Sequence, residues 1–169
     1  MPLNPAICNH LGTNEETLMR DIHSDVKEIF SSMLGIEDIL HVPPAVVDVQ
    51  THFTDCITSM VGFVGHFSGL LSVHVPQSLA LTFTSNMLGM AVEEINDDVN
   101  DALGEIANMI GGSFKHHLAK EGHEVRLSTP SVISGKEYMI TSGQADETLT
   151  LLFDTSEQWF MVSVVLEVE

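Results

Sequence analysis

A carboxylate and a carboxamide, Glu105 and Asn108, stand three residues apart in the stretch DALGEIANMIGGSFK, residues 101–115. The stretch has a helical period, which puts the two side chains one turn apart on the same side. A carboxamide donates and accepts hydrogen bonds without taking up a proton, and a carboxylate pairs with cations. The pair could therefore hydrogen-bond and ion-pair with another molecule, or it could belong to a solvated polar face.

The whole stretch predicts a helix with two different faces. At about 100° per residue, one apolar face must pack against a sheet. The opposite face is polar and contains both Glu105 and Asn108. The apolar face consists of Leu103, Ile106, Ala107, Ile110, Phe114 and Leu118. The polar face consists of Asp101, Glu105, Asn108, Gly112 and Lys115, with Gly111 at its margin.

Gly111 and Gly112 are unfavourable in the interior of a helix, where each costs about 1 kcal/mol relative to alanine. Such glycines usually allow a close approach to the backbone. On the buried margin the approaching group would be a neighbouring helix, and on the exposed face it would be another molecule. The alternative is a solvated face whose glycines allow tight internal packing.

The rest of the sequence predicts the elements that hold this helix. Residues 1–13 show no period and are expected to form a loose leader to a single domain over residues 14–169. A helix is expected with Thr13 as N-cap, Glu16 three residues later and Gly35 at its end. Its apolar positions are Leu18, Ile22, Val26, Ile29, Phe30 and Met33.

Further elements are expected along the chain. First come an extended segment at Ala45–Asp48 and paired strands at Cys56–Gly65 and Phe67–Val75, with a turn at Gly65-His66. A helix at Gln77–Met90 and the long helix from Ile95 to Glu121, closed by Gly122, follow. The last elements are extended segments at Glu124–Pro130 with Ser131–Ser134, at Thr148–Asp154 and at Phe160–Val168. This order favours an α+β fold with a mostly antiparallel sheet packed by two long helices.

The chain also contains a weak internal repeat. The segment EIFSSMLG, residues 28–35, can be laid over EIANMIGG, residues 105–112, and strands follow each. The first copy has Glu28 and Ser31 where the second has Glu105 and Asn108.

Composition limits the classes of partner. The chain has 24 acidic and 6 basic residues among 169, so nucleic acid and anionic membrane surfaces are poor partners. No apolar run reaches the roughly 20 residues that a membrane span needs, and no signal peptide is evident. Cys8 and Cys56 have no metal-binding or redox spacing. We expect a cytoplasmic protein.

The nine histidines do not predict a metal site. His116 and His117 are adjacent, so they point about 100° apart on a helix and cannot readily share a metal. Both suit the end of a helix, where a cation is favoured. The segment Asp97–Glu105 lacks the central glycine of a calcium loop, and no nucleophile-elbow motif supports Ser/His/Asp catalysis.

The pattern Asp101-x-x-x-Glu105-x-x-Asn108, followed by LSTPSVISG with Pro130, resembles the CheC/CheX/FliY chemotaxis phosphatases. The resemblance extends over most of the chain from about residue 15 and includes VGFVGHFSGLLSVHVP. CheC-type members carry two Glu-x-x-Asn pairs and CheX-type members carry one. Because Ser31 cannot replace an amide, the chain resembles the CheX type and a second site at Glu28 is doubtful.

The resemblance implies a CheC-like fold, with a pseudo-repeat of helix-plus-strands units, and a phosphatase that acts on the phospho-aspartate of a CheY-like response regulator. Asn108 would orient the attacking water, and Glu105 would pair with a lysine of the regulator. Asp101, Gly111 and Gly112 would lie at the docking surface. The chain would need no cofactor of its own, because Mg²⁺ would belong to the regulator.

An alternative function and the position of the last strand stay open. The same fold could serve as a non-catalytic dimeric docking or scaffold module for a regulator or another signalling protein. The resemblance also implies a homodimer that pairs sheet edges. The terminal WFMVSVVLEVE has the alternation of a strand that could lie at such an edge or inside the sheet.

Overall fold

The computed structural model describes residues 2–42, 50–119, 122–141 and 143–167. Its helices are α1 (Pro5–Leu11), α2 (Glu15–Leu34), α3 (Gln77–Leu88) and α4 (Asp97–Leu118), with a short 3₁₀ turn at Ala145–Glu147. Its strands are β1 (Leu40–Val42), β2 (Gln50–Gly65), β3 (Ser68–Pro76), β4 (Val125–Leu127), β5 (Ser131–Thr141), β6 (Thr148–Asp154) and β7 (Trp159–Glu167).

The described strands form one seven-stranded sheet in the order β1-β6-β7-β3-β2-β4, with β5 also paired to β2. Each of the described pairings is antiparallel. The α+β class with a mostly antiparallel sheet is therefore confirmed. β7 lies between β6 and β3, so the C-terminal strand is an inner strand and not an edge.

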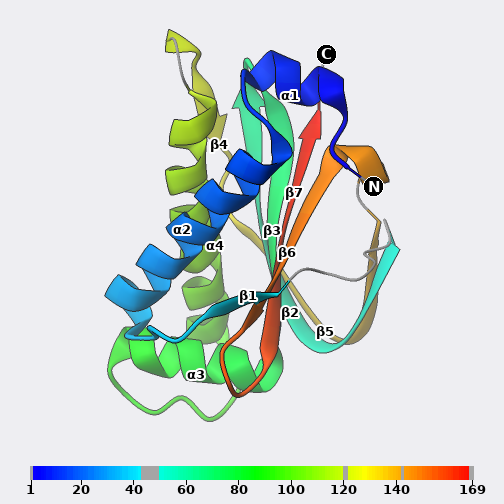
Figure 1. Cartoon of the computed structure of the whole chain (residues 1–169). Helices are drawn as coiled ribbons and strands as arrows, with labels where there is room; N and C mark the ends of the chain where they lie inside the picture. The colour runs from blue at the N-terminus through cyan, green and yellow to red at the C-terminus, as the bar shows by residue number, and fades with distance from the viewer. Residues whose placement is uncertain (1, 43–49, 120–121, 142, 168–169) are drawn as a thin grey trace.

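Helices α2 and α4 lie side by side against one face of the sheet, and α3 crosses near one end of both (Figure 1). An aromatic cluster joins these layers, since the ring of Phe30 in α2 stacks on Phe160 in β7 at 4.9 Å and meets Phe83 in α3 edge-on at 5.0 Å. All three side chains are buried. Each ring pair in such an arrangement contributes about 0.5–1.5 kcal/mol beyond the burial of the two rings.

The first residues of the chain are not the loose leader that the sequence predicts. Residues 5–11 form α1, whose N-cap Asn4 accepts a hydrogen bond from the Ala6 N–H. Leu3 and Ile7 are buried in the common core, and the Leu3 N–H donates to Glu15 at 2.6 Å. Two apolar residues one turn apart are too few to reveal a helical period, so only the tertiary contacts identify this element.

The other helix boundaries lie close to those expected. The N-cap of α2 is Asn14 rather than Thr13, because the Asn14 side chain accepts from the Thr17 N–H. Gly35 ends α2 in the left-handed conformation, with a φ of 65°, as predicted. α4 ends at Leu118, three residues before the expected Glu121. The extended segment expected at Ala45–Asp48 lies outside the described residues.

The paired strands after residue 50 are confirmed, and two of them are longer than expected. β2 begins at Gln50 instead of Cys56, and β5 continues to Thr141 instead of ending near Ser134. Pairing between them is interrupted at Asp55, which has a φ of 49°. Both strands bend sharply in this region (Figure 1). Burial of β5 is low along its length, which explains why alternation did not reveal its second half.

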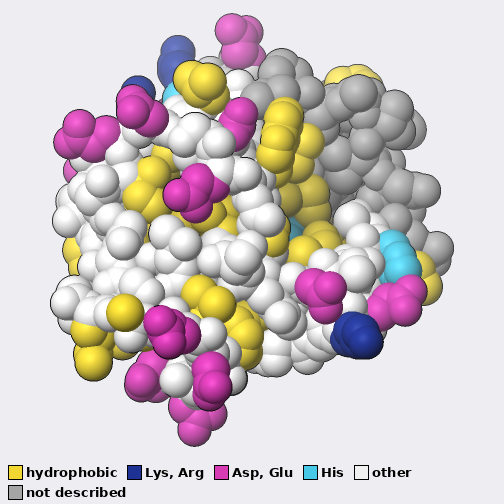
Figure 2. Space-filling view, turned by 90° about the horizontal axis from the view of Figure 1, so that it is seen from below, with side chains coloured by type: hydrophobic (Ala, Val, Ile, Leu, Met, Phe, Trp, Pro, Cys, Tyr) yellow, Lys and Arg dark blue, Asp and Glu magenta, His cyan; other side chains and the backbone are white. Residues whose placement is uncertain are grey.

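The acidic composition is visible on the surface. Figure 2 looks at the end of the molecule where α3 lies, and Asp and Glu side chains are spread over it between smaller apolar patches. Lys and Arg side chains are few in the same view. None of the described helices is long and apolar enough to cross a membrane.

Candidate functional site on the exposed face of α4

Helix α4 is a long amphipathic helix with well-formed ends. The side chain of its N-cap, Asn96, accepts a hydrogen bond from the Val99 N–H at 3.2 Å. Asp97 and Asp98 occupy the first turn, and Lys115, His116 and His117 lie near the last. These charges oppose the partial charges of the helix ends and stabilise it. The predicted apolar face is buried against the sheet and α2.

Glu105 and Asn108 lie on the face of α4 that points away from the sheet. Glu105 and Asp101 are exposed, and Asn108 is half-buried. Within the described part of the chain, the side chains of Glu105 and Asn108 make no hydrogen bond or ion pair. An amide with all its donors and acceptors unused can bind groups of another molecule. The structure thus places the pair on the side of α4 that the helical period predicts, and its role as a site stays a prediction.

One flank of α4 packs closely against β2, β4 and β5. A Cβ atom built on Gly104 would lie 3.5 Å from Pro130 Cβ, and one built on Gly111 would lie 3.6 Å from Val61 Cγ1 and 3.7 Å from Leu127. Both glycines are buried. Gly111 thus faces the sheet, which corrects its assignment to a docking surface. Pro130 supports the turn of α4 that carries Glu105.

Gly112 differs from its neighbour. It is half-buried, and a Cβ atom built on it would meet nothing within 4 Å. It therefore leaves open space beside Asn108, one turn along the same face. The two glycines have separate explanations. Gly111 allows α4 to pack on the sheet, whereas Gly112 leaves the exposed face without a side chain at that position.

The opposite flank of α4 borders a groove, here called the α2–α4 groove, of about 480 Å³. Residues from both helices line it, including Glu28, Ile29 and Met33 from α2 and Met109, Gly112 and Lys115 from α4. Met33 was expected to be a core residue of α2 but is 47% exposed. Sequence reasoning missed this groove, because each helix contributes only one wall.

At the C-terminal end of α4 an ion-pair cluster joins α4 to α2. His117 Nε2 lies 2.9 Å from Asp25, and His117 Nδ1 lies 3.5 Å from Asp21. Burial raises the pKa of Asp25, and the neighbouring His117 counteracts part of that rise. The adjacent His116 is exposed and lines the groove, so the two histidines do point in different directions. Among the described residues, no group of three or more His, Cys, Asp or Glu could hold a metal ion.

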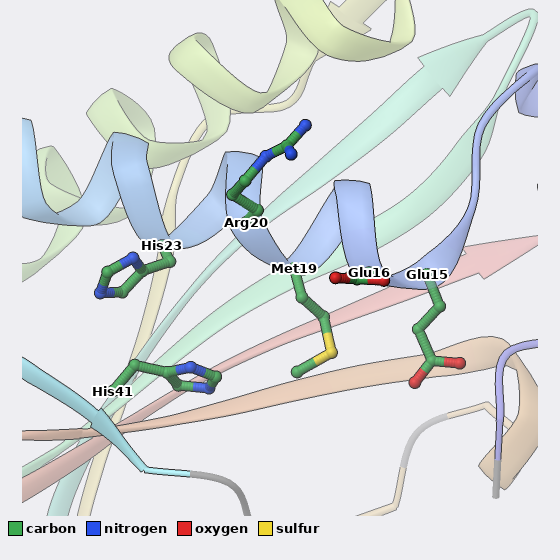
Figure 3. A pocket seen from close by; sticks show the side chains of 6 residues that line it. All are labelled: Glu15, Glu16, Met19, Arg20, His23 and His41. Carbon is green, nitrogen blue, oxygen red and sulfur yellow. The ribbon is translucent and has the colours of Figure 1, made fainter.

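A separate cavity of about 580 Å³ lies along the first half of α2. Its lining is Glu15, Glu16, Met19, Arg20 and His23 from α2 with His41 from β1, as Figure 3 shows. The two histidine rings lie 5.6 Å apart. Burial lowers the pKa of both, with smaller contributions from Lys27 to His23 and from His23 to His41. None of the residues predicted for the site lines this cavity.

The first copy of the internal repeat does not form an equivalent pair. Glu28 lines the α2–α4 groove, whereas Ser31 is exposed on α2 and is not part of the groove lining. A hydroxyl at this position has neither the reach nor the paired donors of an amide. Of the two copies of the repeat, the one on α4 therefore carries the complete carboxylate–amide pair.

The fold and the carboxylate–amide pair together define a class of α+β protein: an antiparallel sheet carries a helix whose polar face can bind another molecule. Residues 57–154 match the family model described as "Chemotaxis phosphatase CheX". The match covers more than half of the chain, so the protein belongs to the CheX family of chemotaxis phosphatases.

Individual relatives agree with this assignment. The chain is 28% identical over 118 residues to the CheY-P phosphatase CheX of Thermotoga maritima, covering 69% of this chain and 75% of that protein. The crystal structure of a chemotaxis protein CheX from Desulfovibrio desulfuricans aligns with a TM-score of 0.77 and 28% identity, over 89% of this chain and 99% of that one.

A more distant structure shares the fold. It is the CheX-CheY-BeF3-Mg²⁺ complex from Borrelia burgdorferi, with a TM-score of 0.72 and 17% identity, over 89% of this chain and 98% of that one. At this identity the likeness concerns the fold alone.

Proposed function

We propose that the protein hydrolyses the phospho-aspartate of a CheY-like response regulator in the cytoplasm, with Asn108 and Glu105 as the residues that enter the regulator's active site. The observation that carries this proposal is the pair on α4, with Glu105 exposed and Asn108 half-buried, whose side chains make no hydrogen bond or ion pair with the described rest of the chain. Family membership and the relative named CheY-P phosphatase support the substrate class.

The reaction needs no covalent bond between this protein and the phosphoryl group. Water attacks phosphorus while the bond from phosphorus to the aspartate oxygen breaks, which yields inorganic phosphate and a free aspartate. Because an acyl phosphate is already reactive, the main need is to hold that water in line with the leaving oxygen. The Asn108 amide can accept a hydrogen bond from the water and donate one to a phosphoryl oxygen.

Glu105 has a different role in this proposal. Its carboxylate lies one turn before Asn108 and would pair with a lysine of the regulator. Such a pair becomes desolvated when the two proteins meet, so it fixes register as well as affinity. Asp101 lies one turn further along the same exposed face and would contribute to the negative charge that attracts the regulator.

The divalent cation would belong to the regulator. A phosphoryl group in transfer needs its charge neutralised, commonly by Mg²⁺. The Borrelia burgdorferi complex contains CheX, CheY, BeF3 and Mg²⁺ together, so a divalent cation is present in that complex. This chain would supply the amide and the carboxylate only.

The test is the lifetime of the regulator's phosphate, measured with and without this protein. Wild type should shorten the lifetime, and Asn108→Ala should remove most of that effect. Asn9→Ala is a matched control, because Asn9 is an exposed asparagine on α1. An unchanged lifetime with wild type rejects the phosphatase. If the two proteins then still co-migrate on a sizing column, the chain is a docking or scaffold module.

We also propose that two copies pair through β5. Among the described strands β5 pairs only with β2, so its other edge is available to a second chain. Ile133 and Met139 on β5 are 40% and 59% exposed. Sedimentation should show a dimer that Ile133→Lys or Met139→Lys weakens, and a wild-type monomer would reject this pairing.

A further inference from the structure

The α2–α4 groove lies beside the exposed pair on α4. Met109 follows Asn108 directly in the chain, and Gly112 belongs both to the face that carries Asn108 and to the lining of the groove. One helical turn, about 5.4 Å along the axis, separates Asn108 from Gly112. Gly112 has no side chain, and a Cβ atom built on it would meet nothing within 4 Å, so Gly112 itself places no barrier between the groove and the amide.

The walls of the groove combine apolar and charged groups. Met33 of α2 and Met109 of α4 face it from opposite helices, and the buried Ile29 lies between them and the core. Methionine side chains are flexible and polarisable, so they adapt to the shape of an apolar group. Lys115 lies toward the C-terminal end of α4 and makes no ion pair within the described residues.

The size of a protein interface decides whether the groove takes part in docking. A specific interface buries about 800 Å² on each partner, which corresponds to a disc with a radius of about 16 Å. A regulator that brings its acyl phosphate to Asn108 therefore covers the groove, one turn away. A concave apolar surface inside such an area is a favourable place for an anchoring side chain.

We propose that the α2–α4 groove binds an apolar side chain of the phosphorylated regulator, next to an acidic group that pairs with Lys115. This inference rests on the proposed function and adds α2 to the surface that selects the partner. The charge argument favours an acidic neighbour: Lys115 is a half-buried cation in the groove lining of a chain with a formal net charge of −18. An acidic group of the partner can pair with Lys115 on the α4 side of the groove, and it is repelled by Glu28 on the α2 side and by most other parts of this protein.

The first test replaces the methionine that is exposed in the groove. Met33→Ala should raise the KM for the phosphorylated regulator roughly tenfold and leave kcat unchanged, because the contact is equally present before and during hydrolysis. Met90→Ala is the matched control, since Met90 is 63% exposed and lies outside the groove lining. It should leave both constants unchanged. Thermal melting of both variants shows whether folding is intact.

The second test concerns the charge. Lys115→Gln should slow association with the regulator and make it less dependent on salt. Lys27→Gln on α2, whose side chain borders a different cavity, is the control and should have little effect. If Met33→Ala leaves the KM unchanged, the groove binds no apolar side chain of the regulator and the inference is overturned. If Lys115→Gln leaves association and its salt dependence unchanged, no acidic group pairs with Lys115 and the inference is overturned as well.

Failure of the groove and failure of the proposed function give different results. A wild type that does not shorten the phosphate lifetime rejects the function itself. A wild type that does, with a Met33→Ala variant of unchanged KM, rejects only the groove. If Met33→Ala instead changes the sedimentation of the free protein at unchanged KM, the groove holds a second copy of the chain, which also overturns the inference.

Discussion

Pro130 lies against Gly104 so closely that a Cβ atom on the glycine would be 3.5 Å from the Pro130 Cβ. This contact joins the connection between β4 and β5 to the turn of α4 directly before Glu105. Interiors are close-packed, so such a contact fixes the helix relative to the sheet. The candidate residues are thus held on a rigid element while their own side chains remain free.

The Gly104 contact predicts that a large side chain there would displace α4. We expect Gly104→Leu to reduce the free energy of unfolding by about 1–3 kcal/mol through overpacking. Phosphatase activity of the folded variant should also fall, because a small displacement of a positioning group slows the reaction strongly. Gly104→Ala is the control: its Cβ would make an ordinary van der Waals contact, so the free energy of unfolding should rise by up to about 1 kcal/mol through helix propensity and activity should change little. Urea unfolding and the phosphate-lifetime assay measure both.

We expect Gly112→Ala to raise stability and to lower activity. Gly112→Ala adds a methyl group where nothing lies within 4 Å, so it should raise the free energy of unfolding by up to about 1 kcal/mol through helix propensity. If the regulator approaches this part of α4 closely, the same change should lower kcat/KM. A variant that is more stable and fully active would show that the exposed glycine has no role in docking.

Glu105 predicts a loss of affinity that depends on salt. Glu105→Gln keeps the shape of the side chain but removes the charge that would pair with a cation of the regulator. We expect kcat/KM to fall by about tenfold or more at low salt, with a smaller difference from wild type at high salt. Asp101→Asn removes a neighbouring charge from the same exposed face and should have a weaker effect. Equal effects of the two changes would contradict a specific role for Glu105.

The buried His74 predicts that stability depends on pH. Its Nδ1 lies 2.8 Å from Thr58 Oγ1, which is also hydrogen-bonded to the Tyr138 hydroxyl, and Phe53 stacks on its ring. Burial lowers the pKa of His74 to about 4, from an ordinary value of 6.5. Between these values the unfolded chain binds a proton that the folded chain does not. Stability therefore falls as the pH drops from about 6.5 toward 4.

The contribution of His74 to this loss should be about 3 kcal/mol, the equivalent of a shift of roughly 2.5 pH units. Unfolding by urea at several pH values between 4 and 7 would measure it. His74→Gln should be less stable than wild type near pH 7, but its stability should depend less steeply on pH. Parallel curves for the two proteins would show that another group is responsible.

Local patterns in the sequence determined the elements and the faces of α4. The 3.6-residue period placed Glu105 and Asn108 on the exposed side, because a helix presents its residues in a fixed order whatever surrounds it. Gly35 and Thr148–Asp154 were likewise placed correctly by local chemistry. The Glu-x-x-Asn pattern, together with the strand pair VGFVGHFSGLLSVHVP before it and LSTPSVISG after it, also indicated the family.

Contacts between distant segments decided the rest. Sequence could not separate Gly111, which packs on the sheet, from Gly112, which does not. Nor could it place β7 inside the sheet, find α1, or bring Met33 of α2 and Met109 of α4 into the lining of one groove. Each of these depends on which residues far apart in the chain become neighbours. That choice is made by the packing of the whole core, which no local period records.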